Sequence, residues 1–182
     1  MKKPLVAWLF AFKPDAVFGL LRRRLAKSAH VDARLGVELL SVGNGVAEAR
    51  LPVSRRVTGA EGVVQRAAVF ALADAAAAAA VAGAFAPVIG ETRTRVASVA
   101  VTFHAETTGD LAASAMAIGS SLDLRAFLKE DDAVDFDVVV DVRAAGDTDI
   151  AQLIYAWRAE KAPPASAALP APEAADTAQP SS

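Results

Sequence analysis

The chain has 182 residues, a net charge of −2 at neutral pH and no cysteine. The lack of cysteine excludes disulfides, thiolate nucleophiles and cysteine metal sites. Two histidines, His30 and His104, lie far apart in the sequence, so we expect no metal site. The small net charge creates no strong field, and we expect no nucleic-acid partner. A composition with 54% hydrophobic and 22% charged residues is that of a globular protein with one domain and terminal extensions.

The first twelve residues place two lysines before a mostly apolar run, as a short signal peptide does. The run ends at Lys13-Pro14-Asp15 without a clear cleavage site, which argues against export. We therefore expect a cytoplasmic protein in which this segment packs on the domain or on a partner subunit.

A helix is predicted over Asp15–Ser28, with Asp15 as its cap and an apolar face of phenylalanine and leucines. Arginines and a lysine crowd its end, where cations complement the helix dipole. Such a basic amphipathic helix can also contact a membrane surface, which stays open as an alternative. Residues 1–35 are thus predicted to form an N-terminal helical extension.

Most of the stretch Gly62–Phe85 is predicted to form one long central helix of roughly six turns. From Ala67 to Gly90 the only polar side chain is Asp74, and six alanines follow it directly. Alanine is the best helix former. The length would suffice for a membrane span, but an aspartate inside a span costs about 3 kcal/mol. We therefore predict a buried core helix, in which desolvation raises the pKa of Asp74 unless a donor pairs with it.

Apart from one short helix, the remaining segments are predicted to be strands. A hairpin is predicted over Gly36–Pro52, turning at Gly43-Asn44-Gly45. Later strands are predicted at residues 92–105, 111–119, 133–143 and 149–158, with a short, charged, helical segment at 122–132. Four strands in succession favour an antiparallel sheet. The predicted fold class is α+β, with one curved sheet wrapped around the central helix over residues 36–161, and the Pro/Ala/Ser-rich residues 162–182 are predicted to be a disordered tail.

This order of elements, and the residues around Asp74, resemble the hotdog-fold thioesterases, in particular the phenylacetate-degradation type of acyl-CoA thioesterase. The family pattern runs Gly-x-x-His-Gly-Gly, four residues, then Leu-Ala-Asp or Leu-Ala-Glu. Here residues 62–67 read Gly-Val-Val-Gln-Arg-Ala and are followed, after four residues, by Leu72-Ala73-Asp74. The strand ending at Phe103 and the turn at residues 109–111, Gly-Asp-Leu, also resemble the family. The resemblance covers about residues 36–160.

The resemblance implies a hydrolase that cleaves an acyl-CoA thioester, with coenzyme A as part of the substrate and no further cofactor. It gives Asp74 the role of general base or nucleophile. Gln65, at the position of the family's histidine, either polarises the thioester carbonyl or makes a hydrogen bond within its loop. Backbone N–H groups near Arg66 and Ala67, with Gly62 beside them, would bind the oxyanion and substrate. Residues 119–121, which are Gly119, Ser120 and Ser121, would lie near the coenzyme A phosphates.

The family builds each site from two chains, so the resemblance also implies a homodimer, or a tetramer of paired dimers. Because Gln65 and Asp74 are nine residues apart, one helix places them about 13 Å apart along its axis. This chain departs from the pattern at Gln65, Arg66 and Ala67, which replace the histidine and two glycines, and Ala78 lacks a hydroxyl found in some members. These departures leave a second hypothesis, in which a catalytically silent hotdog dimer binds an acyl group or a protein partner.

Overall fold

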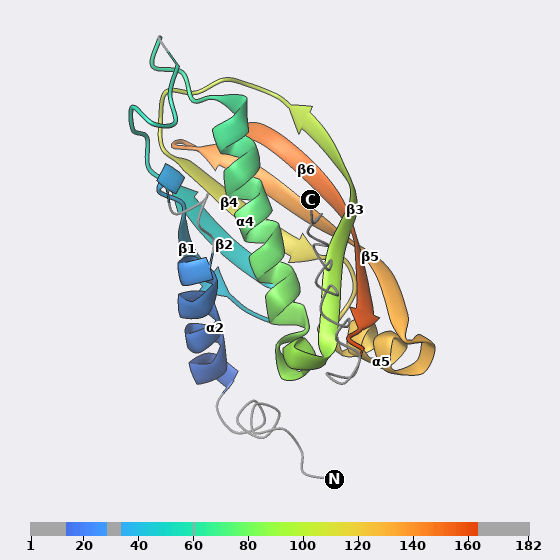
Figure 1. The fold of residues 1–182 in the computed structure, drawn as a ribbon. Coiled ribbons are helices and arrows are strands. Elements are labelled where there is room, and N and C mark those ends of the chain that lie inside the picture. Colours follow the sequence, from blue (N-terminus) through green and yellow to red (C-terminus); the bar gives the residue numbers. More distant parts are fainter. Residues whose placement is uncertain (1–13, 29–33, 60, 164–182) are drawn as a thin grey trace, which may run out of the picture.

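The computed structural model describes residues 14–28, 34–59 and 61–163 as a helix-and-sheet domain (Figure 1). Its strands form one antiparallel sheet in the order β1-β2-β4-β5-β6-β3. In chain order the elements are α2 (Pro14–Ser28), β1 (Glu38–Val42), β2 (Val46–Leu51), α4 (Arg66–Ala84), η1 (Ala86–Glu91), β3 (Thr92–Phe103), β4 (Leu111–Ala117), α5 (Ser121–Asp131), β5 (Ala133–Ala144) and β6 (Thr148–Lys161). The predicted α+β class, with a sheet around an alanine-rich helix, is confirmed.

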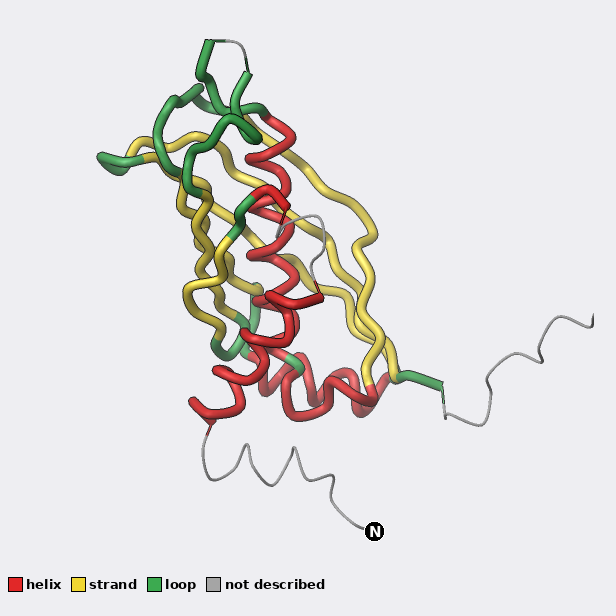
Figure 2. Tube along the Cα trace, turned by 60° about the vertical axis from the view of Figure 1, so that its left-hand side comes forward, coloured by secondary structure: helices red, strands yellow, loops and turns green. Residues whose placement is uncertain are grey.

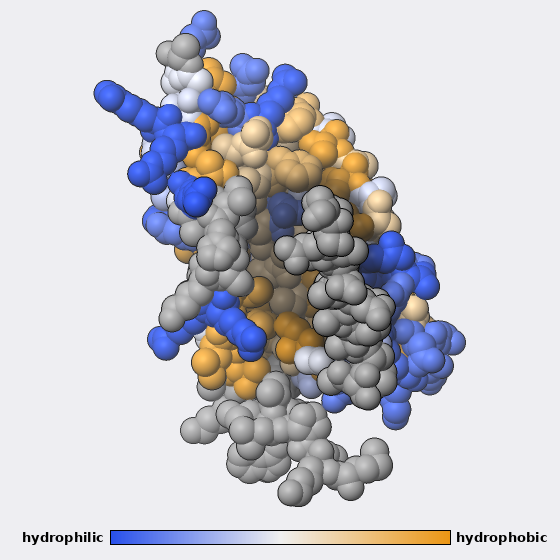
Figure 3. All heavy atoms as spheres, viewed as in Figure 1, coloured by the Kyte–Doolittle hydropathy of each residue, from blue (hydrophilic) through white to orange (hydrophobic). Residues whose placement is uncertain are grey.

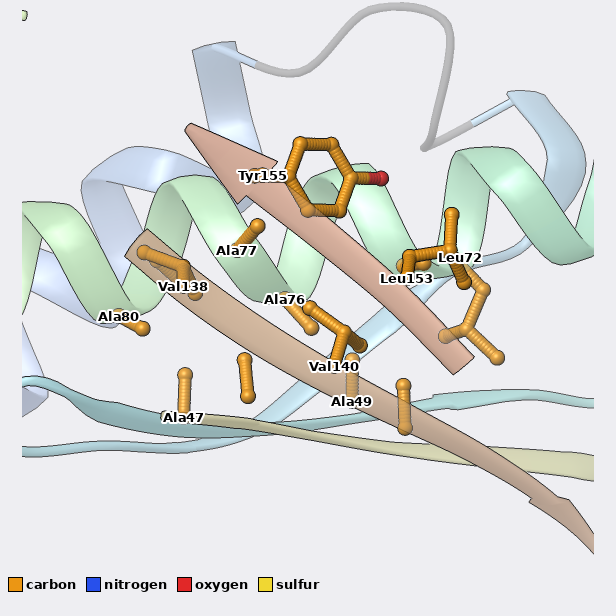
Figure 4. Close-up of a cluster of buried hydrophobic side chains, with 14 of the residues drawn as sticks. Ala47, Ala49, Leu72, Ala76, Ala77, Ala80, Val138, Val140, Leu153 and Tyr155 are labelled. Atoms are coloured by element: carbon orange, nitrogen blue, oxygen red, sulfur yellow. The ribbon is translucent and has the colours of Figure 1, made fainter. Parts of the chain in front are cut away.

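The sheet curves around α4, which lies along its concave side (Figures 1 and 2). Small side chains allow this close approach. Ala76 and Ala80 of α4 and Ala49 of β2 are fully buried, and Val138 and Val140 of β5 close the layer between helix and sheet (Figure 4). Larger residues at the alanine positions would hold the strands away from the helix.

One glycine marks the tightest contact between α4 and the β1–β2 hairpin. A Cβ atom on Gly83 would lie 1.9 Å from the carbonyl oxygen of Gly43. The hairpin itself turns at the predicted residues, with Gly45 at a φ of +78° and the Gly43 N–H donating to the Val46 carbonyl at 2.8 Å. The turn therefore rests directly on the last turn of α4.

Helix α4 begins at Arg66, because the backbone N–H groups of the two residues before it donate to carbonyls outside the helix. The N–H of Val64 donates to the carbonyl of Thr107, and the N–H of Gln65 donates to the carbonyl of Val57. These bonds hold residues 57–65 against the loop that follows β3. The short 3₁₀ helix η1 at the other end was not predicted; it contains Pro87, whose ring fixes a φ angle that suits a helical first turn.

The other predicted elements are present with shifted ends. The charged segment predicted near residues 122–132 is helix α5, which begins one residue earlier because Ser120 caps it by accepting from the Asp123 N–H at 3.1 Å. Strand β6 continues to Lys161, three residues beyond its predicted end, where it still pairs with β3. Strand β3 stops at Phe103, two residues short of its predicted end.

Strand β3 lies at the edge of the sheet and pairs only with β6. All but two of its twelve residues are exposed. Helix α4 packs mainly over β2 and β4, so it leaves the near face of β3 uncovered. Val101 and Phe103 pair with core-facing residues of β6, yet they remain 37% and 38% exposed. A long edge with apolar side chains is a template for pairing with another chain.

Helix α2 has the predicted bounds to within one residue and packs against β1, where the Arg22 guanidinium donates to the Leu40 carbonyl at 2.8 Å. Helix α4 is long and apolar enough to cross a bilayer, but 67% of that window is buried inside the protein, as in a core helix. The predictions for residues 1–13 and for the tail from residue 164 onward lie outside the described residues.

Candidate active site

The first turn of α4 presents backbone N–H groups to solvent. Arg66 and Ala67 are exposed, and their N–H groups have no acceptor among the described residues. A helix leaves its first N–H groups without internal partners and carries positive potential at this end. These two groups can therefore hold a developing oxyanion, as the sequence analysis expected of them.

Gln65 caps this turn with its backbone and directs its side chain into the preceding loop. Its carbonyl accepts from the N–H groups of Ala68 and Val69, and its Nε2 donates to the carbonyl of Thr58 at 3.1 Å. The side-chain amide thus holds the loop in place in the unliganded protein. Gly62 lies in that loop with a φ of +77° and open space around its Cα.

Arg66 is held away from Asp74 by two neighbours. Its guanidinium lies 4.0 Å from Glu106 and stacks over the Phe103 ring, 5.2 Å from the centroid. A salt bridge between Arg66 and Asp74 is therefore not formed. The same residues line a pocket of about 140 Å³ beside the helix start, together with His104 and Thr107.

Asp74 lies two turns further along α4, on the stripe of the helix that the sheet does not cover. The other residues of this stripe are exposed or half-buried, and they are Ala67, Phe70, Ala71, Ala78 and Ala82. The Asp74 carboxylate has no hydrogen bond or ion pair within the described part of the chain. Burial raises its pKa above the ordinary value of 3.8 by desolvation. An unpaired carboxylate with a raised pKa is a candidate general base.

The surface around this stripe is apolar. In Figure 3 apolar residues run down the middle of the molecule over α4 and hydrophilic residues gather at the margins. A carboxylate on such a surface is costly unless it has a function or a partner. This environment distinguishes Asp74 from the other acidic residues whose side chains are described. These are exposed except for Asp141 and Glu160, which accept hydrogen bonds from Gln152 and Arg158.

The candidate site consists of the N–H groups at the start of α4 and the Asp74 carboxylate, and these do not come together within one chain. Arg66 and Asp74 are eight residues apart on a straight helix, about 12 Å along its axis. One thioester carbon cannot contact both groups at once. The helix start and the carboxylate can act together only if each works with a group from a second chain.

Residues 119–121 lie at the opposite end of α4. Gly119 has a φ of +100°, the Ser120 hydroxyl donates to the Asp123 carboxylate at 2.7 Å, and Ser121 is buried with its hydroxyl close to Gly45. Gly45 in turn lies next to Ala84, the last residue of α4. The proposed coenzyme A residues are thus about 27 Å from Arg66 in the same chain, measured along the helix.

Tyr155 also belongs to this site, although no sequence pattern pointed to it. It lies on β6, its side chain is fully buried, and its ring centroid is 6.2 Å from that of Phe70 on the open stripe. The alternation of β6 predicts that Tyr155 faces inward but not which helix residue it meets. Within the described residues there is no cluster of three histidine or acidic side chains that could hold a metal ion.

The chain is similar to known proteins at the level of its fold. No family model matches the chain, and no curated protein matches it. Among solved structures, a probable thioesterase from Pseudomonas aeruginosa is similar over 79% of this chain and 95% of its own, with a TM-score of 0.69 and 15% identity. A thioesterase-family protein from Silicibacter pomeroyi covers 79% of this chain and 98% of its own, with a TM-score of 0.64 and 18% identity.

A thioesterase from Haemophilus influenzae is similar over 77% of this chain and 90% of its own, with a TM-score of 0.61 and 15% identity. The six-stranded antiparallel sheet around α4 is therefore the hotdog fold that thioesterases use. The predicted hotdog fold is confirmed, while the phenylacetate-degradation type stays a prediction.

Proposed function

We propose that this protein is a hotdog acyl-CoA thioesterase in which Asp74 activates water. The observation that carries the proposal is the Asp74 carboxylate itself, which is half-buried, unpaired and placed on the open apolar stripe of α4. Desolvation raises its pKa, which makes it a stronger base than an exposed aspartate. The surrounding alanines leave room for an acyl chain along the helix.

The reaction needs one base and one oxyanion site. The Asp74 carboxylate takes a proton from water as the water oxygen attacks the thioester carbonyl carbon. The negative charge that develops on the carbonyl oxygen is held by the N–H groups of Arg66 and Ala67 of a second chain. The C–S bond then breaks, and the coenzyme A thiolate takes the proton from Asp74. The products are a carboxylic acid and free coenzyme A.

Direct attack by Asp74 is the other route that the same residue allows. The carboxylate would then form a mixed anhydride with the acyl group and expel the thiolate, and water would cleave the anhydride. Label found in Asp74 after a single turnover in ¹⁸O-labelled water identifies the anhydride route, because general-base catalysis never labels Asp74. General-base catalysis places the label in the product acid, whereas attack on the anhydride at the Asp74 carbonyl leaves an unlabelled product acid and a labelled Asp74.

A homodimer follows from the distance between the two groups. The uncovered edge of β3 and the open stripe of α4 are adjacent apolar surfaces that a second copy would cover. A two-fold axis beside β3 would bring the start of one α4 toward Asp74 of the other. It would also bring residues 119–121 of one chain toward the helix start of its partner, where the coenzyme A part of the substrate would lie.

The decisive measurement is steady-state hydrolysis of short, long and aromatic acyl-CoAs, followed by release of free thiol. Asp74→Asn is expected to lose at least about 100-fold in kcat/KM on the best substrate, the scale of a general base. Asp137→Asn is the matched control, because Asp137 is an exposed aspartate on the outer face of β5. Equal activity of Asp74→Asn and wild type would contradict the proposal.

The contacts of the Gln65 and Arg66 side chains favour the alternative function, a protein without catalytic activity that binds an acyl group or a protein partner. The Gln65 amide is bound to Thr58, and the Arg66 side chain occupies the helix start where the family has glycine. A folded dimer that binds a non-hydrolysable acyl-CoA analogue yet cleaves no member of the panel would establish this second function.

A further inference from the structure

Tyr155 carries a buried hydroxyl that the described residues leave without a hydrogen bond. The side chain is 0% exposed, and the hydroxyl oxygen has no partner. Proteins rarely bury a hydroxyl without one, because the group loses its hydrogen bonds to water. A bound water or a substrate atom at this place would complete it.

The hydroxyl faces the part of α4 that carries Asp74. The Tyr155 ring lies against Phe70, and Asp74 follows Phe70 by four residues, one turn along the same face. In Figure 4 the ring lies beside α4 and its oxygen points along the helix toward the end that carries Leu72. The geometry therefore places a donor and a carboxylate on one side of one helical turn.

The electrostatics agree with this placement. Burial raises the pKa of Tyr155, and the negative charge of Asp74 raises it further. The hydroxyl therefore keeps its proton throughout the pH range in which Asp74 ionises. It can donate a hydrogen bond at every pH at which the enzyme would work.

The charged side chains of the described residues that contact α4 lie at its ends: Arg125 of α5 donates to the carbonyl of Ala84, and Arg66 lies beside Glu106. The strands that face α4 present apolar side chains apart from Tyr155, and their charged residues lie on the outer face or at strand ends. Glu91 of η1 is exposed. On α2, Arg22, Arg23 and Arg24 are exposed.

We propose that Tyr155 is a positioning residue for Asp74: its hydroxyl donates to the water that the Asp74 carboxylate binds. The water then has one lone pair held by Tyr155, one proton directed at Asp74 and a second lone pair free for the thioester carbon. This role rests on the thioesterase proposed above. Because the water accepts a hydrogen bond from Tyr155, it becomes a stronger hydrogen-bond donor to Asp74. This stronger bond favours the ionised form of the carboxylate.

The first test is an NMR titration, which needs no enzymatic activity. Its signal can be assigned directly, because Tyr155 is the only tyrosine of the chain. Protein labelled with ¹³C at the tyrosine ζ carbon gives a single NMR signal for the tyrosine ring. In wild type this signal is expected to shift in one step with a midpoint above 3.8, the ordinary aspartate pKa, as Asp74 ionises. In Asp74→Asn the step is expected to vanish. A wild-type signal that does not change with pH would overturn the proposal.

The second test uses Tyr155→Phe, which keeps the ring and removes the oxygen. We expect kcat to fall about 10-fold with KM unchanged, the scale of one hydrogen bond. Without the donor the ionised Asp74 is less stabilised, so the acid limb of the pH profile is expected to move up by about half a unit or more. The fold is expected to be kept, because phenylalanine fills the space of the ring, and circular dichroism checks this.

Trp157→Phe is the matched control, since the Trp157 Nε1 is also buried without a partner on the same face of β6. It is expected to leave the acid limb in place. A wild-type kcat and acid limb in Tyr155→Phe would overturn the positioning role. A clear NMR step together with no turnover on any acyl-CoA would refute the thioesterase and still support Tyr155 as the partner of the Asp74 water.

Discussion

Gly83 illustrates how one residue sets the distance between α4 and the hairpin. A glycine inside a helix usually costs about 1 kcal/mol relative to alanine, so its replacement is usually stabilising. Here the new methyl group would meet the backbone oxygen of Gly43 at 1.9 Å. We predict that Gly83→Ala lowers the free energy of unfolding by about 2 kcal/mol or more, through overpacking against a rigid turn. Urea denaturation measures this change.

Gly19→Ala in α2 is the control for that prediction. A Cβ atom on Gly19 would meet nothing within 4 Å. The helix propensity of alanine then acts alone, and the variant is expected to gain up to about 1 kcal/mol. A stabilised Gly83→Ala would show that the hairpin turn can move away from α4.

Asp74 links the stability of the fold to pH. Its folded-state pKa lies above the unfolded value of 3.8 because burial disfavours the charge. The native state therefore binds more protons than the unfolded state between these two pKa values, and stability falls as the pH rises through this window. Below the unfolded pKa the carboxyl is protonated in both states and costs nothing.

The consequence is that Asp74→Asn is predicted to be more stable than wild type at pH 7, and that this gain disappears near pH 3.8. Denaturant unfolding of both proteins at the two pH values measures the difference. Asp137→Asn gives the baseline for removal of an exposed aspartate. A variant less stable than wild type at pH 7 would mean that the ionised carboxylate has a stabilising partner.

At the scale of elements, the edge strand β3 decides whether two chains can pair. Val101 lies on its apolar face and is 37% exposed. We predict that Val101→Lys converts a dimer of the 18.7 kDa chain to a folded monomer, because it places a charge in the apolar contact. Sedimentation equilibrium measures the mass, and circular dichroism checks the fold.

Leu122→Lys is the matched substitution, since Leu122 is a more exposed apolar residue, at 73%, on α5. It is expected to leave the mass unchanged. If wild type is a monomer at concentrations where it hydrolyses its substrate, the shared site is excluded.

The elements themselves could be predicted from the sequence because local chemistry specifies them. The alanine run determines α4, and the Gly-Asn-Gly turn determines the β1–β2 hairpin. The ends of elements were less accurate, since they depend on contacts with distant residues. Strand β6, for example, continues three residues beyond its predicted end, to Lys161, because it still pairs with β3 there.

The candidate site was predictable only in part, for a related reason. Asp74 stands out in the sequence as the single polar residue of an apolar helix. Its neighbour Tyr155 comes from a strand 81 residues later, and only the register of β6 against the helix brings the two together. The bond between Gln65 and Thr58 likewise depends on the loop conformation, which no sequence pattern specifies.

At the scale of the whole molecule, the open stripe of α4 and the open edge of β3 belong to one surface. The oxyanion groups lie at the start of α4, and Asp74 lies two turns away on the same helix. The proposed enzyme thus has two sites per dimer, each built from the helix start of one chain and the carboxylate of the other. Such a site can be tested without knowing how the dimer is arranged.

The test combines two inactive variants. Asp74→Asn removes the base, and Ala67→Pro removes one oxyanion N–H at a helix position in the first turn, where proline is tolerated. Each homodimer is expected to be inactive. After mixing and re-equilibration, half of the dimers contain one chain of each kind, and one of their two sites carries both intact groups. We predict recovery of about one quarter of wild-type activity by random mixing.

The recovery depends on which chain supplies each group. If one chain supplied both Asp74 and the oxyanion N–H groups, every site in the mixture would lack one of them, and no activity would return. Mixing Asp74→Asn with Asp74→Asn,Ala67→Pro is the control, because no site then carries the carboxylate. Activity near one quarter in the first mixture and none in the second would establish a site that two chains share across the open stripe of α4.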